Sequence, residues 1–148
     1  MRQLILASVL ATVPVLALAD AAEDAIEARA GYMKMLAINM ATLSGMARGD
    51  VPYDADAATA AGNNIEALSN YALTGLFIEG TSTDDGADTE ALPAIWENSE
   101  DFATKFAGLQ EAAAGAGAAA GGGQDALGPV LQKLGGACKA CHDDYREE

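Results

Sequence analysis

Apolar residues recur at intervals of three, four and seven in four separate stretches of this chain, the spacing that places side chains on one face of a helix. The first stretch covers residues 20–48, the second 54–76, the third 93–113 and the fourth about 127–145. None of them shows the sustained period-two alternation of a half-buried strand. Amphipathic helices joined by short connections bury their apolar faces most simply against one another. We therefore predict an all-α chain folded as an antiparallel four-helix bundle.

The segments between these stretches are rich in turn residues. Residues 80–92 are polar and contain Gly, Asp and Thr, which predicts a loop. Pro93 suits the first position of the third helix, where its missing N–H is not needed. Residues 115–123 contain five glycines in nine positions, which predicts a flexible connection to the fourth helix. In the first stretch the expected core-facing residues are Ile26, Met33, Leu36, Met40 and Leu43.

The beginning of the chain has the pattern of an export signal. A positive start at Arg2 precedes a sixteen-residue apolar run from Leu4 to Ala19, which ends in a small-x-small sequence. The run is shorter than the roughly 20 apolar residues of a membrane span, although an uncleaved anchor is the alternative. We predict a signal peptide over residues 1–19, cleaved after Ala19, and a single domain over 20–148. The expected location is the periplasm, an oxidising compartment.

The charge of the chain limits its partners. It contains 8 Lys+Arg and 22 Asp+Glu, a formal net charge of −14 at pH 7. Binding to nucleic acid requires a basic face that neutralises phosphates, and so few basic residues cannot provide one. The same balance disfavours docking on an anionic membrane surface. We expect no nucleic-acid partner and no membrane association after the signal peptide is removed.

The strongest chemical signal is the sequence C-x-x-C-H formed by Cys138, Cys141 and His142. On a helix, positions i, i+3 and i+4 share one face, so both thiols and the imidazole are expected to point the same way. Two thiols at this spacing can form thioethers with the two vinyl groups of one haem, while the histidine binds the iron as proximal ligand. The motif therefore predicts one covalently attached haem c.

The two cysteines allow three other interpretations. A thioredoxin-like redox pair expects a βαβ setting, which the pattern lacks. A zinc site needs about four ligands, and these three residues exhaust the cysteines and the single histidine of the chain. A disulfide within one helical turn would be strained. Because His142 is the only histidine, the sixth position of the iron must hold a methionine, another side chain, an external ligand or nothing.

Arg29 and Met33 lie on the inward face predicted for the first stretch. A guanidinium inside a bundle is costly unless it meets an anion, and the two propionates of a haem suit its fork geometry. The alternative is that only the stem of Arg29 is buried while its head reaches water. Met33 follows one turn later, and thioether sulfur is an accepted ligand of haem iron. The alternative for Met33 is that it fills the core.

An exported helical chain with this motif near its C-terminus resembles the class II c-type cytochromes, the cytochrome c′ family, and is close to those of purple photosynthetic bacteria. The resemblance covers essentially the whole predicted domain. The segments that carry it are Glu27-Ala28-Arg29, Val51-Pro52-Tyr53-Asp54-Ala55, Gly80-Thr81-Ser82, Ala94-Ile95-Trp96 and, most specifically, residues 131–146 around the motif.

This resemblance implies a four-helix bundle that is often a homodimer through its first two helices. It implies that Arg29 lies beside a haem propionate and that Thr89 and Glu90 contact the haem. Ala30 replaces the polar residue often found there in the family, so any hydrogen bond at that point is lost. Met33 matches the distal position, which is apolar or aromatic in high-spin members that bind NO or CO. A low-spin branch has methionine there as sixth ligand.

The favoured hypothesis is a periplasmic mono-haem electron carrier, with iron between His142 and Met33 and an unidentified redox partner protein. The rival is a five-coordinate binder of NO or CO, and a haem-free module with a disulfide is the third reading. Nothing in the sequence indicates substrate turnover, so we expect no enzyme. Lys133, Lys139 and Arg146 either mark a docking edge for the partner or are ordinary cations near the end of a helix.

Overall fold

The computed structural model describes residues 16–148, with side chains described from residue 21 onward. The predicted signal peptide falls mostly on residues 1–15, which lie outside the described range. The helical elements in chain order are α1 (Leu16–Arg48), α2 (Ala55–Ser69), η1 (Leu73–Leu76), η2 (Thr83–Asp85), α3 (Ala94–Glu97), α4 (Ser99–Ala113), α5 (Ala116–Ala120), η3 (Gln124–Ala126) and α6 (Leu127–Tyr145). Within this range, no helix combines the length and the apolar character needed to cross a membrane.

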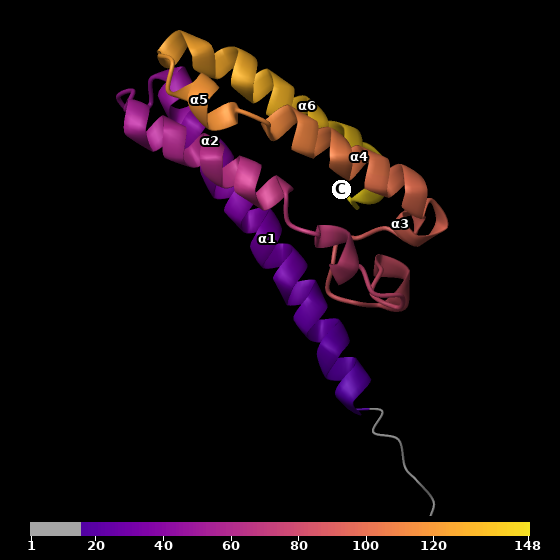
Figure 1. The fold of residues 1–148 in the computed structure, drawn as a ribbon. Helices are drawn as coiled ribbons and strands as arrows, with labels where there is room; N and C mark the ends of the chain where they lie inside the picture. The colour runs from indigo at the N-terminus through magenta and orange to yellow at the C-terminus, as the bar shows by residue number, and fades with distance from the viewer. Residues whose placement is uncertain (1–15) are drawn as a thin grey trace, which may run out of the picture.

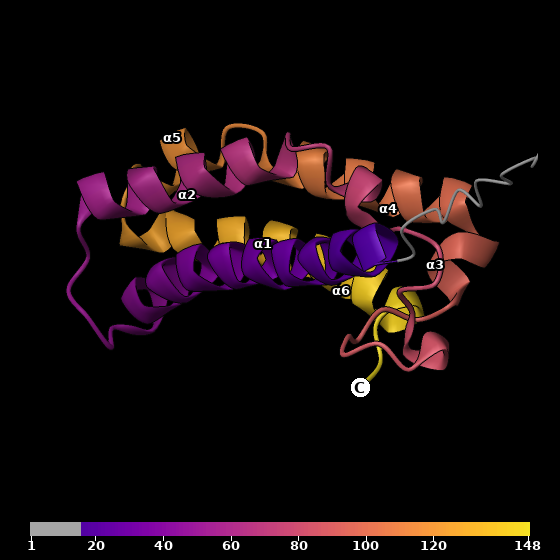
Figure 2. The same ribbon diagram turned by 90° about the horizontal axis from the view of Figure 1, so that it is seen from below.

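The four long helices α1, α2, α4 and α6 form an elongated antiparallel bundle (Figures 1 and 2). α2 returns along α1, and α6 returns along α4 after the short α5. α1 also packs on α6, so the first and last helices of the chain are neighbours. The C-terminus lies at the same end of the bundle as α3 (Figure 2). The prediction of an all-α four-helix bundle is confirmed.

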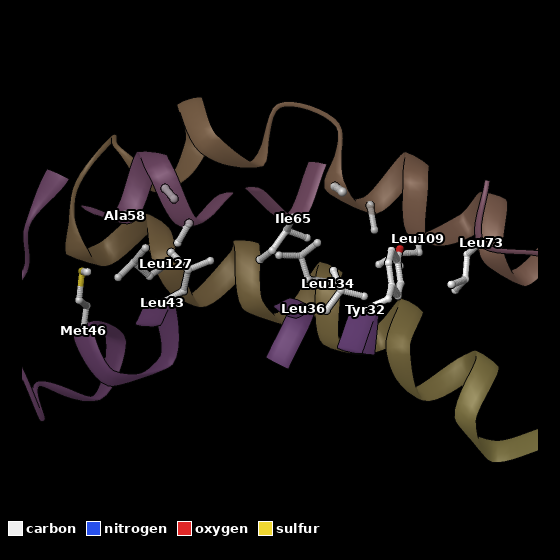
Figure 3. Close-up of a cluster of buried hydrophobic side chains, with 14 residues drawn as sticks. Tyr32, Leu36, Leu43, Met46, Ala58, Ile65, Leu73, Leu109, Leu127 and Leu134 are labelled. Carbon is white, nitrogen blue, oxygen red and sulfur yellow. The ribbon is translucent and has the colours of Figure 1, made fainter. Parts of the chain in front are cut away.

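The core is a continuous cluster of side chains from all four long helices (Figure 3). Its most deeply buried large residues are Leu43, Ile65, Leu73, Leu127 and Leu134. Burial of such side chains is the main source of stability in a chain with few aromatic residues.

The core-facing side of α1 differs from the predicted one. Leu36 and Leu43 are buried as expected, but Tyr32 and Met46 are buried as well. Ile26 and Met40 are only half-buried, and Met33 is 38% exposed. The apolar stripe predicted from the sequence is therefore wider than the core. One edge of it, which includes Met33, is not covered by other side chains of the protein.

Two predicted helices are shorter than their apolar patterns. α2 ends at Ser69, because the side chains of Ser69 and Asn70 both donate hydrogen bonds to the carbonyl of Glu66 and so compete with the helical ladder. The apolar residues that follow belong to the 3-10 turn η1, where Leu73 is buried in place of Ala72. The third predicted helix is interrupted at Asn98, whose φ of −127° and ψ of 47° separate α3 from α4.

The prediction of a flexible connection over residues 115–123 is wrong. This segment contains α5, which packs closely on α2. A Cβ on Gly62 would lie 2.6 Å from the backbone of Gly117, and a Cβ on Gly117 would collide with the side chain of Asn63. The glycines at these positions therefore allow two helices to approach closely, and their abundance does not signal mobility.

Candidate haem site

Cys138, Cys141 and His142 lie in the C-terminal half of α6, and all three are half-buried. The helix is continuous through the motif, so the three side chains share one face as the spacing predicts. Both cysteines are free thiols, and no further cluster of His, Cys, Asp or Glu within residues 16–148 is suited to hold a metal ion. The zinc interpretation and the disulfide interpretation therefore find no support in the fold.

The motif faces two adjoining cavities between α6 and α1. The first cavity has a volume of about 460 Å³ and the second of about 400 Å³. They share four lining residues, Met33, Cys141, His142 and Arg146, which shows that they meet at the motif. Cys138 lines the second cavity, toward the middle of the bundle.

The opposite wall is the edge of the α1 stripe that the core leaves uncovered. Its residues recur at intervals of four and three along the helix and are Ile26, Ala30, Met33, Ala37 and Met40. A folded chain rarely leaves a contiguous apolar face without a function. This face and the two thiols enclose the space that a flat apolar macrocycle needs, so these residues fit a haem c.

Arg29 contributes a buried positive charge to the first cavity. Its side chain is 4% exposed, and the guanidinium lies 4.8 Å from the centroid of the Phe77 ring. Nη1 donates to Oγ1 of Thr81 at 3.0 Å, and Nη2 donates to the carbonyl of Thr81 at 3.1 Å. Burial lowers the pKa of Arg29. The alternative that its head reaches water is wrong.

No carboxylate in the part of the chain that the structure describes forms an ion pair with Arg29. A buried guanidinium without a counter-charge is unfavourable, which makes the first cavity suited to an anionic group. The propionates of a haem are such groups, so this observation also fits haem c.

A loop brings Thr89 and Glu90 to the rim of the first cavity. Oγ1 of Thr89 accepts a hydrogen bond from Nη2 of Arg29 at 3.4 Å and another from the N–H of Ala91 at 3.2 Å. The carboxylate of Glu90 is exposed and lies 3.7 Å from Nε of Arg146. Ala30 lines the same cavity from α1. These residues, which the family resemblance implies as haem contacts, therefore lie around one cavity.

The end of the chain fixes this loop. The N–H of Leu92 donates to the carbonyl of Tyr145 at 3.1 Å, and the N–H of Glu147 donates to the carbonyl of Glu90 at 2.8 Å. Ala91 and Arg146 form an isolated antiparallel bridge between the two segments. The rim of the cavity is thus attached directly to the residues that follow His142.

Met33 lies between the two cavities and, within the described residues, is the only methionine that lines both. It belongs to neither buried cluster, so the alternative that it fills the core is wrong. Met40 packs against the core and lines the second cavity alone, and Met35 is 48% exposed outside both. Met33 on α1 and His142 on α6 therefore line the same two cavities from different helices.

Burial sets the protonation of the motif. It lowers the pKa of His142, with a further contribution from the charge of Arg146, which keeps the imidazole neutral and its lone pair available. It raises the pKa of Cys138, and it raises the pKa of Cys141 to about 11 in spite of the nearby charge of Lys105. The neutral imidazole is the form that binds metal ions.

Sequence reasoning missed an aromatic cluster beside the first cavity. Phe77 packs edge-on against Phe102 with ring centroids 4.8 Å apart, and Phe102 packs edge-on against Tyr145 at 5.2 Å. The phenol of Tyr145 donates to the carboxylate of Asp101 at 2.7 Å. Tyr145 was visible as part of the α6 stripe, but nothing in the pattern singled out Phe77, which lies in a loop.

Comparisons with known proteins identify a family that the chain resembles over most of its length. The sequence pattern of the family described as Cytochrome C′ matches residues 24–146. The chain is 42% identical over 146 residues to cytochrome c′ of Cereibacter sphaeroides, covering 99% of this chain and 98% of the relative. It is 43% identical over 126 residues to cytochrome c-554 of the same organism, covering 85% of this chain and 82% of the relative.

The fold is similar to solved structures as well. Cytochrome c′ from Rhodobacter spheriodes superposes with a TM-score of 0.81 at 42% identity, over 86% of this chain and 98% of that chain. A nitric oxide complex of a mutant cytochrome c prime from Alcaligenes xylosoxidans superposes with a TM-score of 0.72 at 30% identity, over 86% of this chain and 97% of that chain.

Proposed function

The chain belongs to the cytochrome c′ family, and from that membership we propose that it carries single electrons through one haem c attached to Cys138 and Cys141. Members of this family are haem proteins without enzymatic activity. A haem at this position supplies one-electron exchange at its iron. The observation that supports the proposal is that Met33 from α1 and His142 from α6 both line the two cavities.

Each residue has a distinct part in this proposal. His142 provides the proximal ligand through its neutral imidazole, and Met33 provides the distal ligand through its thioether. Arg29, held by Thr81 and Thr89, offers a positive charge to a propionate. Methionine as axial ligand raises the reduction potential of haem iron, which suits a protein that accepts an electron.

Substitution of Met33 tests the electron-carrier proposal. The wild-type protein should give a pyridine haemochrome spectrum of haem c, a low-spin resonance signal and a far-red absorption band of sulfur bound to iron. Met33→Ala should abolish the far-red band, turn the iron high-spin and allow carbon monoxide to bind. Met35→Ala, an exposed methionine two residues away, is the matched control and should leave all three signals unchanged. An unaltered spectrum in Met33→Ala would contradict the ligand assignment.

The second candidate function is reversible binding of NO or CO at an open sixth position. It is supported by the solved nitric oxide complex of a relative and by the 38% exposure of Met33, which leaves its side chain room to move away. The two functions differ in the wild-type protein: a high-spin resting spectrum with immediate uptake of carbon monoxide favours the gas binder.

We also propose export to the periplasm with cleavage after Ala19. The superpositions on solved relatives cover nearly the whole of each relative but only 86% of this chain. The family pattern begins at residue 24. The cytochrome c′ of Cereibacter sphaeroides, in contrast, aligns with 99% of the chain. The mass and N-terminal sequence of protein from the periplasmic fraction test this: the chain should begin at Asp20 and carry the added mass of one haem.

The proposed protein partners are a second copy of the chain and a redox protein. A groove on the α1–α2 face is lined by Met35, Ile38 and Tyr71, all exposed, and it suits a homodimer. Light scattering at several concentrations tests that state. Of the three cations that could mark a docking edge, Lys139 and Arg146 pair with Asp143 and Glu90, and Lys133 donates a hydrogen bond to the carbonyl of Glu111.

A further inference from the structure

Lys105 connects α4 to the segment between the two cysteines. Its Nζ donates a hydrogen bond to the carbonyl of Ala140 at 3.0 Å and forms an ion pair with Asp144 at 2.7 Å. Asp101 lies 3.8 Å away on the same helix as Lys105. Lys105 also lines the second cavity together with Cys138, Cys141 and His142. A positive charge is therefore held beside the haem-attachment segment.

This charge is less exposed than the two cations that lie beside the motif in the chain, Lys139 and Arg146. The side chain of Lys105 is 23% exposed, whereas those of Lys139 and Arg146 are 73% and 48% exposed. Water and salt screen an exposed charge strongly and a partly buried charge much less. Lys105 therefore acts on the cavity more strongly than Lys139, although Lys139 lies within the motif itself.

We infer that Lys105 raises the reduction potential of the haem site, because it holds a positive charge on the side of the site where the cysteines lie. This inference rests on the proposed attachment of haem c at Cys138 and Cys141. Reduction adds one electron to the site without a bond being made or broken. A nearby positive charge stabilises that added electron, so Lys105 favours the reduced protein.

The two carboxylates beside Lys105 make the sign of the effect testable. In the wild-type protein, Lys105 offsets part of the negative charge of Asp144 and Asp101. Removal of the cation leaves both carboxylates beside the cavity, which favours the oxidised protein. Removal of Asp144 alone has the opposite effect, because the cation is then less compensated.

The test is a redox titration of the haem-loaded protein with dithionite and ferricyanide in the presence of mediators. Lys105→Met should lower the ratio of reduced to oxidised protein at fixed ambient potential about threefold to tenfold, equivalent to about 28 to 59 mV for one electron. Asp144→Asn should shift the potential in the positive direction, and Lys105→Arg should stay near the wild-type value. The double variant with Lys105→Met and Asp144→Asn should lie between the two single variants.

Lys139→Met is the matched control, because it removes an exposed lysine that is also paired with a carboxylate, and its shift should be clearly smaller than that of Lys105→Met. A merely structural role would shift Lys105→Met and Asp144→Asn in the same direction, and that result overturns the inference. A wild-type potential in Lys105→Met also overturns it while leaving the proposed function intact. Wild-type protein without covalent haem, in contrast, would overturn both.

Discussion

Nη1 of Arg29 on α1 and Oγ1 of Thr81 are joined by a buried hydrogen bond of 3.0 Å, although the residues are 52 positions apart in the chain. The same guanidinium donates to the carbonyl of Thr81 and lies over the ring of Phe77. The loop beyond α2 is therefore attached to α1 by one side chain. This contact therefore holds the positive charge of Arg29 next to the loop that forms the rim of the first cavity.

Removal of the Thr81 hydroxyl should weaken this attachment. Thr81→Val keeps the shape of the side chain but leaves a buried donor of Arg29 and the carbonyl of Ile78 without their partner. An unsatisfied buried polar group costs about 1–3 kcal/mol, so the free energy of unfolding in urea should fall by about that amount. Thr83→Val, in the same loop but outside this contact, is the control and should change it by less than about 0.5 kcal/mol.

The interlock of α2 and α5 predicts opposite effects of alanine at two glycines. Gly117→Ala places a Cβ against the side chain of Asn63, and such overpacking should cost about 1–3 kcal/mol in urea unfolding. Gly108→Ala, on α4 with no heavy atom within 4 Å of the new Cβ, should stabilise the protein by up to about 1 kcal/mol. Equal effects of the two substitutions would contradict the close approach of α2 and α5.

Tyr32 should contribute to loss of stability in alkali. Burial raises its pKa from 10.0 to about 12, with a smaller contribution from the charge of Cys138, and its phenol donates to the carbonyl of Leu68 at 3.0 Å. Because the pKa is higher in the folded protein, this contribution is complete below about pH 10. It is lost as the pH rises through about 12, since the unfolded state gives up its proton first.

Urea unfolding at pH 9 and pH 11 checks this expectation. Tyr32→Phe should lower stability at pH 9 by about 1 kcal/mol through the lost hydrogen bond. Between pH 9 and pH 11 its stability should fall less steeply than that of the wild type. Parallel slopes for the two proteins would show that Tyr32 does not titrate with unfolding.

Both thiols should be needed for permanent attachment of the haem. A double variant with Cys138→Ser and Cys141→Ser keeps the helix, the two cavities and His142, so any haem that binds should be extracted by acidified butanone. Intact-mass measurement should show the peptide mass alone for this variant and one additional porphyrin for the wild type. Haem that stays on the double variant after extraction would argue against thioether attachment.

The features that depend on local spacing could be predicted from the sequence. The helical periodicity predicted the four long helices, and the C-x-x-C-H spacing predicted that Cys138, Cys141 and His142 share a face. The interruption at Asn98 and the end of α2 were not predictable, because hydrogen-bond competition within single turns decides them. The role of α5 was hidden because glycine favours both mobility and close packing, and only the position of Asn63 separates the two.

In the haem site, too, the features that follow local spacing could be predicted and those that depend on distant segments could not. Met33 and Arg29 were found because they follow the α1 period, yet their surroundings depend on distant segments. The partners of Arg29 lie in a loop, and Lys105 reaches the motif from α4; no periodicity connects these residues. The uncovered edge of the α1 stripe was read as core because a sequence pattern cannot distinguish an apolar face that meets protein from one that meets a ligand.

The hydrogen bonds from Leu92 to Tyr145 and from Glu147 to Glu90 determine how late in synthesis the loop that carries Thr89 and Glu90 can complete its contacts. The partners of residues 89–92 in these bonds are Tyr145 and Glu147, which are synthesised after both cysteines. The rim of the first cavity beside Arg29 is therefore complete only once the residues after His142 are in place.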